Sequence, residues 1–269
     1  MDASLVKELR DKTNAGMMDC KKALIESAGD LEKAVDILRK KGIATAAKRA
    51  DKEAKEGLVC AHVSADGKLG VLIELNCETD FVAKNEGFAS LANTILNDIV
   101  KASSKDIKNN TIVNNALKES IDKKIINAVG KIGEKICLKR FVKYETTGKI
   151  GSYIHLGGKL GILLEVEGNA SAELLKDLCM QIAAAHPDYI NSSEVPANVL
   201  EKEKEIIKAQ IKGKPDNIVD KIVMGKLSKF YEEKCLIEQI FIKDNDKKVK
   251  NILGAVTVKR FSRFQIGAQ

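Results

Sequence analysis

Histidines are the side chains best suited to acid-base chemistry at neutral pH, because their pKa lies near that range. The sequence has three of them: His62 and His155 fall in strand-like patterns, and His186 precedes a proline at a predicted helix end. No serine, cysteine or acid has a spacing that makes it a catalytic partner of any of the three. We therefore interpret the histidines as structural or surface residues and predict that the protein is not an enzyme.

Cysteines are the next candidates, since their thiolates bind metals and act as nucleophiles. The six cysteines lie far apart and form no C-x-x-C pair, and only three histidines are present to complete a metal site. We interpret them as reduced thiols that fill core space in a cytosolic protein, and we expect neither a metal nor a cofactor. The six are Cys20, Cys60, Cys77, Cys137, Cys179 and Cys235.

Two other patterns could carry chemistry, but both have structural explanations. The glycine pair Gly157-Gly158 lies in a predicted hairpin turn, without the strand, loop and helix that cradle a phosphate. Glu74 and Glu165 occupy equivalent positions of a repeated strand, which favours a structural role over a paired acid and base. The residues thus give no support to covalent catalysis.

The stretch NCETDFVAKNEGF, residues 76–88, places an acid beside a large aromatic where a strand pattern changes to a helix pattern. Thr79 or Asp80 can cap the helix, and an acid there also meets the positive end of the helix dipole. Phe81 can staple the helix to the sheet. Alternatively, Phe81 protrudes into another protein, because a strand-to-helix turn lies at the rim of a domain.

The elements that position this turn begin with a small helical unit. We predict three short helices, capped by Ser4, Asp19 and Asp30. Asn14-Ala15-Gly16 ends the first helix and Ala28-Gly29 ends the second.

The third helix has an apolar face at the spacing i, i+3, i+4, i+7, and we expect it to end at Gly42. That face consists of Leu31, Ala34, Val35 and Leu38. Residues 44–57 are rich in alanine and charge without an apolar stripe, which predicts a helical or mobile linker.

After Gly57 the apolar residues recur with a period of two, which predicts an antiparallel hairpin. Residues 59–63 and 69–75 alternate, and Asp66-Gly67 between them supplies the turn. Further along the chain, residues 91–99 and 112–129 have helical patterns and residues 136–144 return to a strand pattern.

Two internal repeats organise the rest of the chain. The segment GKLGVLIELN, which begins at Gly67, recurs 91 residues later as GKLGILLEVE from Gly158. The triplet KRF at residues 139–141 recurs 120 residues later at residues 259–261. Both halves therefore contain a hairpin, a helical stretch and a closing strand. The second half is 29 residues longer between its hairpin and its closing strand, which indicates an insertion.

The insertion has the pattern of two amphipathic helices joined by the turn Gly213-Lys214-Pro215. So short a turn makes the helices antiparallel, and we expect a projecting coiled-coil arm. Its apolar faces close on each other or partly on a partner, and the sequence leaves both open. The faces consist of Leu200, Ile207 and Ile211 on one helix and Val219, Val223, Leu227 and Phe230 on the other.

Composition narrows the class of protein further. A length of 269 residues with 44% hydrophobic composition suggests more than one folding unit. No run approaches the roughly 20 apolar residues that span a bilayer, and the start MDASLVKELR lacks the apolar segment of a signal peptide. We therefore expect a cytoplasmic protein that does not associate with membranes.

Charge and aromatic content bear on nucleic-acid binding. The net charge is +7 from 45 basic and 38 acidic residues, and most lysines stand beside acids. Only 4% of the residues are aromatic and tryptophan is absent, so we expect no direct contact with nucleic acid. The alternative is a ribosome- or RNA-associated basic binding protein, suggested by the charge and by the run KKVK at residues 247–250.

Two long stretches carry a family resemblance. LVKELRDKTNAGMMDCKKAL, residues 5–24, and ELNCETDFVAKNEGF, residues 74–88, closely resemble the signature stretches of bacterial elongation factor Ts, the nucleotide exchange factor for elongation factor Tu. The resemblance implies an α+β fold in several parts. They are a three-helix bundle like a ubiquitin-associated (UBA) domain with its linker, residues 1–55; a duplicated antiparallel sheet-plus-helix core, with its first half at residues 56–146 and its second at residues 147–190 and 236–269; and an inserted antiparallel coiled-coil hairpin, residues 191–235.

The resemblance also implies a mechanism without covalent chemistry. In the family the Thr-Asp-Phe turn is pushed between two helices of the GTPase domain of elongation factor Tu, near the magnesium and phosphate site, so that GDP leaves faster. Asp80 and Phe81 would be the intruding pair in this chain, with Thr79 and Val82 framing them.

Further contacts follow from the same resemblance. Arg10, Met17 and Met18 would grip another helix of the GTPase domain, and His155 would dock a second surface of the partner. Core packing of one of the two methionines is the alternative. The chain stops soon after its last predicted strand, so we expect the extra terminal helix of some members to be absent. Family members differ in association, which leaves a homodimer or a 2:2 complex open.

Overall fold

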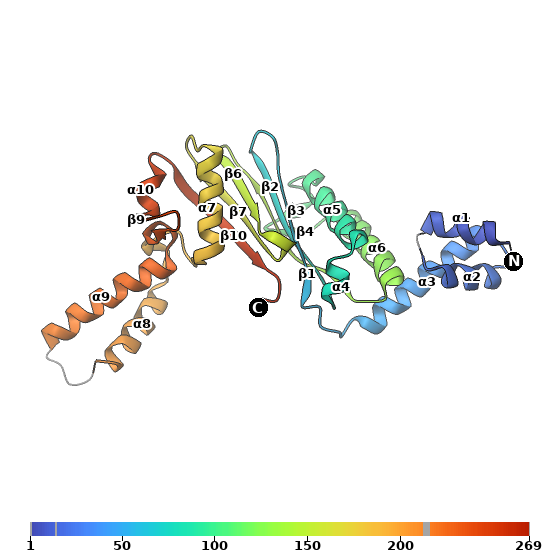
Figure 1. The fold of residues 1–269 in the computed structure, drawn as a ribbon, viewed down its shortest axis with the longest axis horizontal. Helices are drawn as coiled ribbons and strands as arrows, with labels where there is room; N and C mark the ends of the chain where they lie inside the picture. The colour runs from blue at the N-terminus through green and yellow to red at the C-terminus, as the bar shows by residue number, and fades with distance from the viewer. Residues whose placement is uncertain (1, 14, 212–215, 269) are drawn as a thin grey trace.

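The computed structural model describes residues 2–13, 15–211 and 216–268, with no side-chain description at 216–218. It combines α-helices with antiparallel sheets. The centre of the molecule has four layers, in the order helices, sheet, sheet, helix (Figure 1). Three amino-terminal helices extend from one end of these layers, and two helices project from the other.

The amino-terminal helices are α1 (Ala3–Thr13), α2 (Met17–Glu26) and α3 (Leu31–Arg49). They pack around a small buried cluster that includes Leu9, Cys20, Ala23, Leu24 and Ala34. The turn between α2 and α3 has left-handed backbone at Ala28 and Gly29, which confirms the predicted end of the second helix.

One of the three predicted helix caps is confirmed and two are wrong. The Asp30 carboxylate accepts the Lys33 N–H at 3.0 Å and caps α3. Ser4 lies inside α1, where its own N–H donates to the Asp2 carboxylate at 3.0 Å. Asp19 lies in the first turn of α2, after the cap residue Gly16, and pairs with Lys41. Asn14, part of the predicted break between α1 and α2, lies outside the described residues.

Gly42 does not end α3, which continues to Arg49 and includes part of the predicted linker. A Cβ added to Gly130 of α6 (Asn115–Ile132) would lie 2.9 Å from the Gly42 Cα. Glycine is therefore present at residue 42 because two helices cross there in close contact, and not because a helix stops.

The first sheet has the order β1-β2-β5, with all neighbours antiparallel. Its strands are β1 (Glu56–Val63), β2 (Leu69–Cys77) and β5 (Ile136–Glu145), which confirms the predicted hairpin and closing strand. The outer face is covered by α4 (Asp80–Ala83), α5 (Glu86–Lys101) and α6. Alternate residues of β2, such as Val71, Ile73 and Leu75, are fully buried against these helices.

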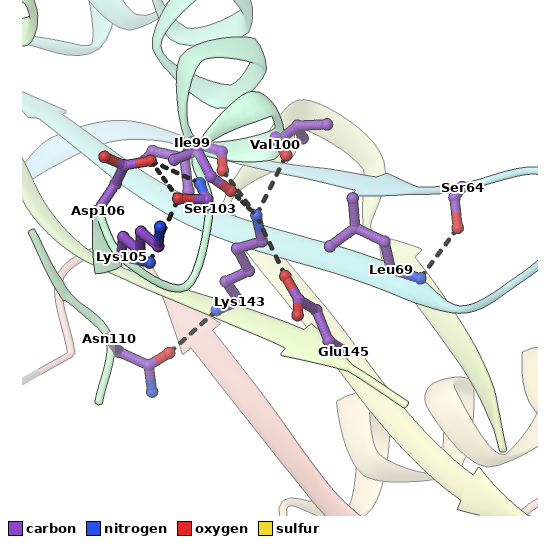
Figure 2. A network of polar contacts seen from close by, with 11 residues as sticks. Ser64, Leu69, Ile99, Val100, Ser103, Lys105, Asp106, Asn110, Lys143 and Glu145 are labelled. Atoms are coloured by element: carbon purple, nitrogen blue, oxygen red, sulfur yellow. Dashed lines mark hydrogen bonds and ion pairs between the residues drawn. The ribbon is translucent and has the colours of Figure 1, made fainter. Parts of the chain in front are cut away.

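A small hairpin of β3 (Ile107–Lys108) and β4 (Thr111–Ile112) connects α5 to α6, and the sequence pattern did not predict it. Between its strands Asn109 and Asn110 have left-handed backbone. The Asn110 side chain accepts the Lys143 N–H of β5 at 3.0 Å (Figure 2). This contact covers part of the edge that β5 would otherwise present to solvent.

The Lys143 side chain also binds the carbonyl oxygens at the carboxyl end of α5, as Figure 2 shows. Its side chain is only 7% exposed, and its Nζ donates to the carbonyls of Ile99, at 3.3 Å, and Val100, at 3.2 Å, and to that of Ala102. The last carbonyls of a helix have no partner within the helix, and a cation there also meets the negative end of the dipole. Lys143 therefore fastens the end of α5 to the sheet.

The second sheet has the order β10-β7-β6 and is also antiparallel. Its strands are β6 (Lys149–Ile154), β7 (Leu160–Glu167) and β10 (Thr257–Gln265), and α7 (Ala172–Ala185) covers its outer face. The remaining short elements are η1 (Leu156–Gly158), η2 (Ser192–Glu194), η3 (Leu236–Glu238), β8 (Ile240–Phe241), β9 (Asp244–Lys248) and α10 (Val249–Leu253).

The inner faces of the two sheets meet in what we call the inter-sheet cluster, made of Val59, Leu72, Val142, Tyr144, Ile150, Leu163 and Phe264. Equivalent glycines make room for it. A Cβ on Gly70 would lie 2.6 Å from Ile150 and 2.9 Å from Leu163. A Cβ on Gly161, the repeat counterpart of Gly70, would lie 3.0 Å from Leu72. Each half therefore receives the other's apolar side chains at the same position.

Ion pairs between a buried glutamate and a partly exposed arginine occur at equivalent positions of the two halves. The Arg140 Nε lies 2.6 Å from Glu74, and the Arg260 Nε lies 2.5 Å from Glu165, each across neighbouring strands of one sheet. These contacts agree with the structural role predicted for the two glutamates. Each guanidinium also stacks on an aromatic ring of the other half: Arg140 on Phe264 at 4.4 Å and Arg260 on Tyr144 at 4.0 Å.

The inserted helices are α8 (Ala197–Ala209) and α9 (Asp216–Lys234), which project from the end opposite α1–α3 (Figure 1). Their apolar faces close on each other through Ile207, Ile211, Val223 and Leu227. The predicted turn Gly213-Lys214-Pro215 lies outside the described residues. None of the helices in the described part of the chain is both long and apolar enough to cross a bilayer.

Candidate protein-binding site

Thr79 begins the turn between β2 and α4 and is fixed by three hydrogen bonds. Its Oγ1 accepts the Val82 N–H at 3.4 Å, so Thr79, and not Asp80, caps α4. The Thr79 hydroxyl donates to one Glu134 oxygen at 2.7 Å, and the Thr79 N–H donates to the other at 3.0 Å. Glu134 follows the end of α6, so the turn is bound to a second part of the core.

Asp80 lies in the first turn of α4 and forms an ion pair with Lys84, at 2.7 Å. The hydrogen bond from Lys84 lowers the pKa of the Asp80 carboxyl below its usual range. Asp80 therefore carries its charge at neutral pH, at the positive end of a helix and on the surface.

Phe81 is 82% exposed, so the predicted staple to the sheet is wrong. Ala83 is buried and the half-buried Val82 packs against the cluster under α5. Successive helical residues point about 100° apart, so a helix held by Val82 and Ala83 directs Phe81 outward. The aromatic ring is therefore accessible to another molecule.

The candidate residues of the amino-terminal helices are also accessible. Met17 and Met18, in the first turn of α2, are 59% and 62% exposed, so the alternative that one of them packs in the core is wrong. Arg10 of α1 is exposed as well. Ile25, seven residues after Met18, is a further exposed apolar residue of α2 that the sequence reasoning missed. The heptad spacing puts it on the same helix face as Met18.

His155 lies on the surface just before η1, and its Nδ1 is 3.0 Å from the Tyr153 hydroxyl. Leu156, which the sequence reasoning also missed, is 90% exposed, more than any other large apolar side chain in the part of the chain that the structure describes. The signal for it was present: a leucine followed by Gly157 and Gly158 occupies a tight turn, where both glycines have left-handed backbone.

His155 and Phe81 lie at the same end of the sheets, because Glu56, at the start of β1, is the strand partner of Cys77 just before α4 and pairs with Lys159 just after η1. The η1 turn is held there because Lys159, directly after η1, pairs with Glu56 at the start of β1. Gly158 lies against the next part of that strand, where an added Cβ would be 2.9 Å from Leu58. The first turn of α2, which carries Met17 and Met18, lies beside the middle of α3, where Asp19 pairs with Lys41.

The cysteines lie mostly in the interior of the protein. All six cysteines are free, and four are buried: Cys20, Cys77, Cys179 and Cys235. Burial is the main cause that raises the pKa of the Cys77 thiol to about 12, with the Glu134 charge adding to it. Within the described ranges no cluster of three or more histidine, cysteine, aspartate or glutamate side chains could hold a metal ion.

Comparisons with known proteins identify the chain further. A family model described as Elongation factor TS matches residues 78–268. The chain is 46% identical over 279 residues to Elongation factor Ts of Aquifex aeolicus (strain VF5), covering 97% of this chain and 96% of the relative. It is 45% identical over 284 residues to Elongation factor Ts of Clostridium botulinum (strain Alaska E43 / Type E3), covering 99% and 93%. The chain is also 45% identical over 287 residues to Elongation factor Ts of Chlorobium phaeobacteroides (strain BS1), covering 100% of this chain and 99% of the relative.

These matches define the class of protein as a translation elongation factor that promotes nucleotide exchange without covalent catalysis. The chain belongs to the elongation factor Ts family.

Proposed function

We propose that this protein binds elongation factor Tu in its GDP form and speeds GDP release during translation elongation. Asp80 and Phe81 enter the GTPase domain near its magnesium and phosphate site and displace the elements that hold them. The observation that carries the proposal is the exposed Phe81 ring on a helix whose next two residues, Val82 and Ala83, pack against the core. Family membership supports it by naming the class of partner.

The energetics fit this role. Nucleotide affinity rests largely on the metal ion and on backbone donors around the phosphates, so their displacement weakens binding without a contact to the base. A factor that binds the nucleotide-free state better than the GDP state must weaken GDP by the same factor. Burial of one phenylalanine contributes about 1.5 to 3 kcal/mol, which corresponds to a roughly tenfold to hundredfold effect. Other contacts must therefore hold the complex while Phe81 acts.

We assign those contacts to the other exposed candidates. Arg10, Met17 and Met18 grip a second helix of the GTPase domain, and His155 docks another surface of the same partner. Methionine suits the first contact because its flexible, polarizable side chain adapts to an apolar surface. Thr79 and Val82 frame the intruding pair, and their contacts to Glu134 and to the core hold the turn in place.

The remaining assignments follow from family membership. We propose that residues 1–55 form a bundle like a ubiquitin-associated domain and its linker. Residues 56–146 then form the first half of the core, residues 147–190 and 236–269 the second half, and residues 191–235 a coiled-coil arm. The protein acts in the cytoplasm, and family membership leaves both a homodimer and a 2:2 complex with elongation factor Tu open.

The decisive experiment measures release of a fluorescent GDP analogue from purified elongation factor Tu. We expect the wild-type chain to accelerate release and Phe81→Ala to reduce the acceleration by roughly ten- to hundredfold, with Asp80→Ala also slower. Met224→Ala is the matched control, since Met224 is 65% exposed on α9, far from the turn. The proposal fails if elongation factor Tu releases GDP at the same rate with Phe81→Ala as with Met224→Ala.

The alternative, a basic RNA-binding protein, gains no support from the lysine run at residues 247–250. Lys247 pairs with Asp244 at 2.8 Å, Lys248 with Glu232 at 2.8 Å, and Lys250 with Glu238 at 3.0 Å. Because the described carboxylates offset the charge of all three lysines, this run does not form an unpaired basic patch for phosphates.

A further inference from the structure

The last residue of α3, Arg49, is joined directly to the strand end that carries the Thr79 turn. The Arg49 Nη1 lies 2.9 Å from one Glu78 oxygen and 3.2 Å from the other. Glu78 is largely buried, and its carboxylate also accepts the Lys135 N–H at 2.6 Å. Since Glu78 directly precedes Thr79, an amino-terminal helix and the proposed intruding turn meet within one residue of each other.

Two neighbouring residues, Glu134 and Lys135, bind the two parts that meet here: Glu134 binds the Thr79 turn, and Lys135 binds the chain just after α3. Glu134 binds the hydroxyl and the N–H of Thr79. The Lys135 Nζ donates to the carbonyl oxygens of Ala50, at 2.6 Å, and Lys52, at 2.8 Å, just beyond the end of α3. A cation at this position also meets the negative end of the α3 dipole. We call Arg49, Glu78, Thr79, Glu134 and Lys135 the joint.

A second contact fixes the angle of α3. Helices α3 and α6 cross at Gly42 and Gly130, where a Cβ on Gly130 would lie 2.9 Å from the Gly42 Cα. From this crossing α3 runs seven residues to Arg49, and α6 with its cap Gly133 runs four residues to Glu134. The crossing and the joint are therefore two attachment points of α3 on the same core, so α3 cannot swing freely about either of them.

Because the joint ties α3 to the Thr79 turn, we propose that Arg49 and Glu78 are positioning residues that hold Met17 and Met18 at a fixed place relative to Phe81. The inference rests on the proposed exchange function. When the methionines grip the partner, a rigid α3 delivers Phe81 to one defined position. Part of the binding free energy gained at α2 then favours the insertion of Phe81 on α4. A contact far from the nucleotide can in this way raise the rate of GDP release and not only the affinity for the partner.

The effect of loosening the joint follows from this arrangement. Arg49→Met removes the ion pair and leaves the α2 surface and the Phe81 ring unchanged. Both surfaces still bind, but α3 keeps only its crossing with α6 and the Lys135 contacts, so it holds the two surfaces less firmly relative to each other. We therefore expect the limiting rate of GDP release at saturation to fall about two- to thirtyfold, the range for residues that modulate the coupling between two distant sites. The concentration that gives half of the limiting rate should change less than twofold.

The test compares Arg49→Met, Arg49→Lys and Lys48→Met in the full-length chain. Release of a fluorescent GDP analogue from elongation factor Tu is measured over a range of factor concentrations. Arg49→Lys keeps the charge and should recover most of the limiting rate. Lys48 is the exposed neighbour of Arg49 on α3, so Lys48→Met should match wild type.

This design separates positioning from folding. A variant that is partly unfolded has fewer active molecules, so it needs a higher concentration but reaches the same limiting rate at saturation. A fall in limiting rate with rescue by lysine supports the positioning role. The inference is overturned if Arg49→Met reaches the limiting rate of Lys48→Met, whether or not its half-saturating concentration rises. A wild-type chain that does not accelerate release would instead refute the exchange function, and the inference with it.

Discussion

Replacement of Gly161 by alanine tests the contact between the two sheets most directly. The new methyl group would collide with the Val59 side chain and lie 2.8 Å from the Ile154 Cδ1 and 3.0 Å from the Leu72 Cδ1. Val59 and Leu72 are almost completely buried, so neither has space to withdraw. Overpacking of a filled core typically costs about 1 to 3 kcal/mol, and we expect Gly161→Ala to lower the free energy of unfolding by that amount.

The matched control is the same substitution at Gly225. This residue lies on the exposed surface of α9, and an alanine Cβ there would have no atom within 4 Å among the described residues. Alanine is favoured over glycine inside a helix by roughly 0.5 to 1 kcal/mol, so Gly225→Ala should raise stability. One chemical change is therefore expected to have opposite signs at the two sites.

Thermal and urea unfolding, followed by far-ultraviolet circular dichroism, measure both variants. A shift of roughly 2 to 4 °C in Tm per kcal/mol applies to domains of about 150 to 250 residues, so the two variants should differ by several degrees. Gly70→Ala, the repeat counterpart, should behave like Gly161→Ala. The reasoning is refuted if Gly161→Ala is as stable as Gly225→Ala, because the inner faces of the sheets would then not be in tight contact.

Lys143→Met should lower the free energy of unfolding by about 1 to 3 kcal/mol, because it leaves carbonyls at the end of α5 without their donor. Urea unfolding measures this, and unchanged stability would contradict it. His186→Gly should raise stability by about 1 kcal/mol, since His186 has left-handed backbone, φ 45°, at the end of α7; a Tm at or below that of wild type would count against it. Burial raises the pKa of Cys77 and of Cys179 to about 12 each, so both stay protonated at pH 8 and should react with a thiol reagent only on unfolding. Fast labelling of either cysteine in the native protein is the contrary result.

The periodic patterns of the sequence were reliable where they reflected two faces of one element. The alternation along residues 69–75 predicted β2, because one face of that strand packs on helices and the other on a sheet. The repeats predicted that Gly70 and Gly161 are equivalent. They did not predict that each accepts the other half's side chains, since a pattern within one strand carries no information about which surface lies opposite.

Single residues with two physical roles were the source of most wrong predictions. Gly42 reads as a helix end, but its lack of a side chain serves a helix crossing with a residue 88 positions later in the chain. Ser4 and Asp19 are both good capping residues, yet Asp2 and Gly16 precede α1 and α2, because the start of a helix depends on where its apolar face must lie.

The candidate site was predicted only in part, because the roles of its residues also depend on distant parts of the fold. Capping preferences limited the cap of α4 to Thr79 or Asp80. In the structure Thr79 is the cap, and it also binds Glu134, a contact that the sequence did not predict. The exposure of Phe81 could not be derived locally, because it depends on Val82 and Ala83 finding a core built by α5 and β2. The joint could not be predicted, because residues 49, 78 and 134 are far apart in the sequence and each looks like an ordinary charged surface residue there.

The mutual fit of Gly70 and Gly161 makes this single chain resemble a dimer whose two subunits have been fused. Residues of the inter-sheet cluster contact both halves, so a change in one half must be accommodated in the other. Residues on the outer faces contact only one, and there the halves have become different: one carries the Phe81 turn and the helices before it, and the other carries the α8–α9 arm. The repeated middle thus allows the two ends to differ in structure independently of each other.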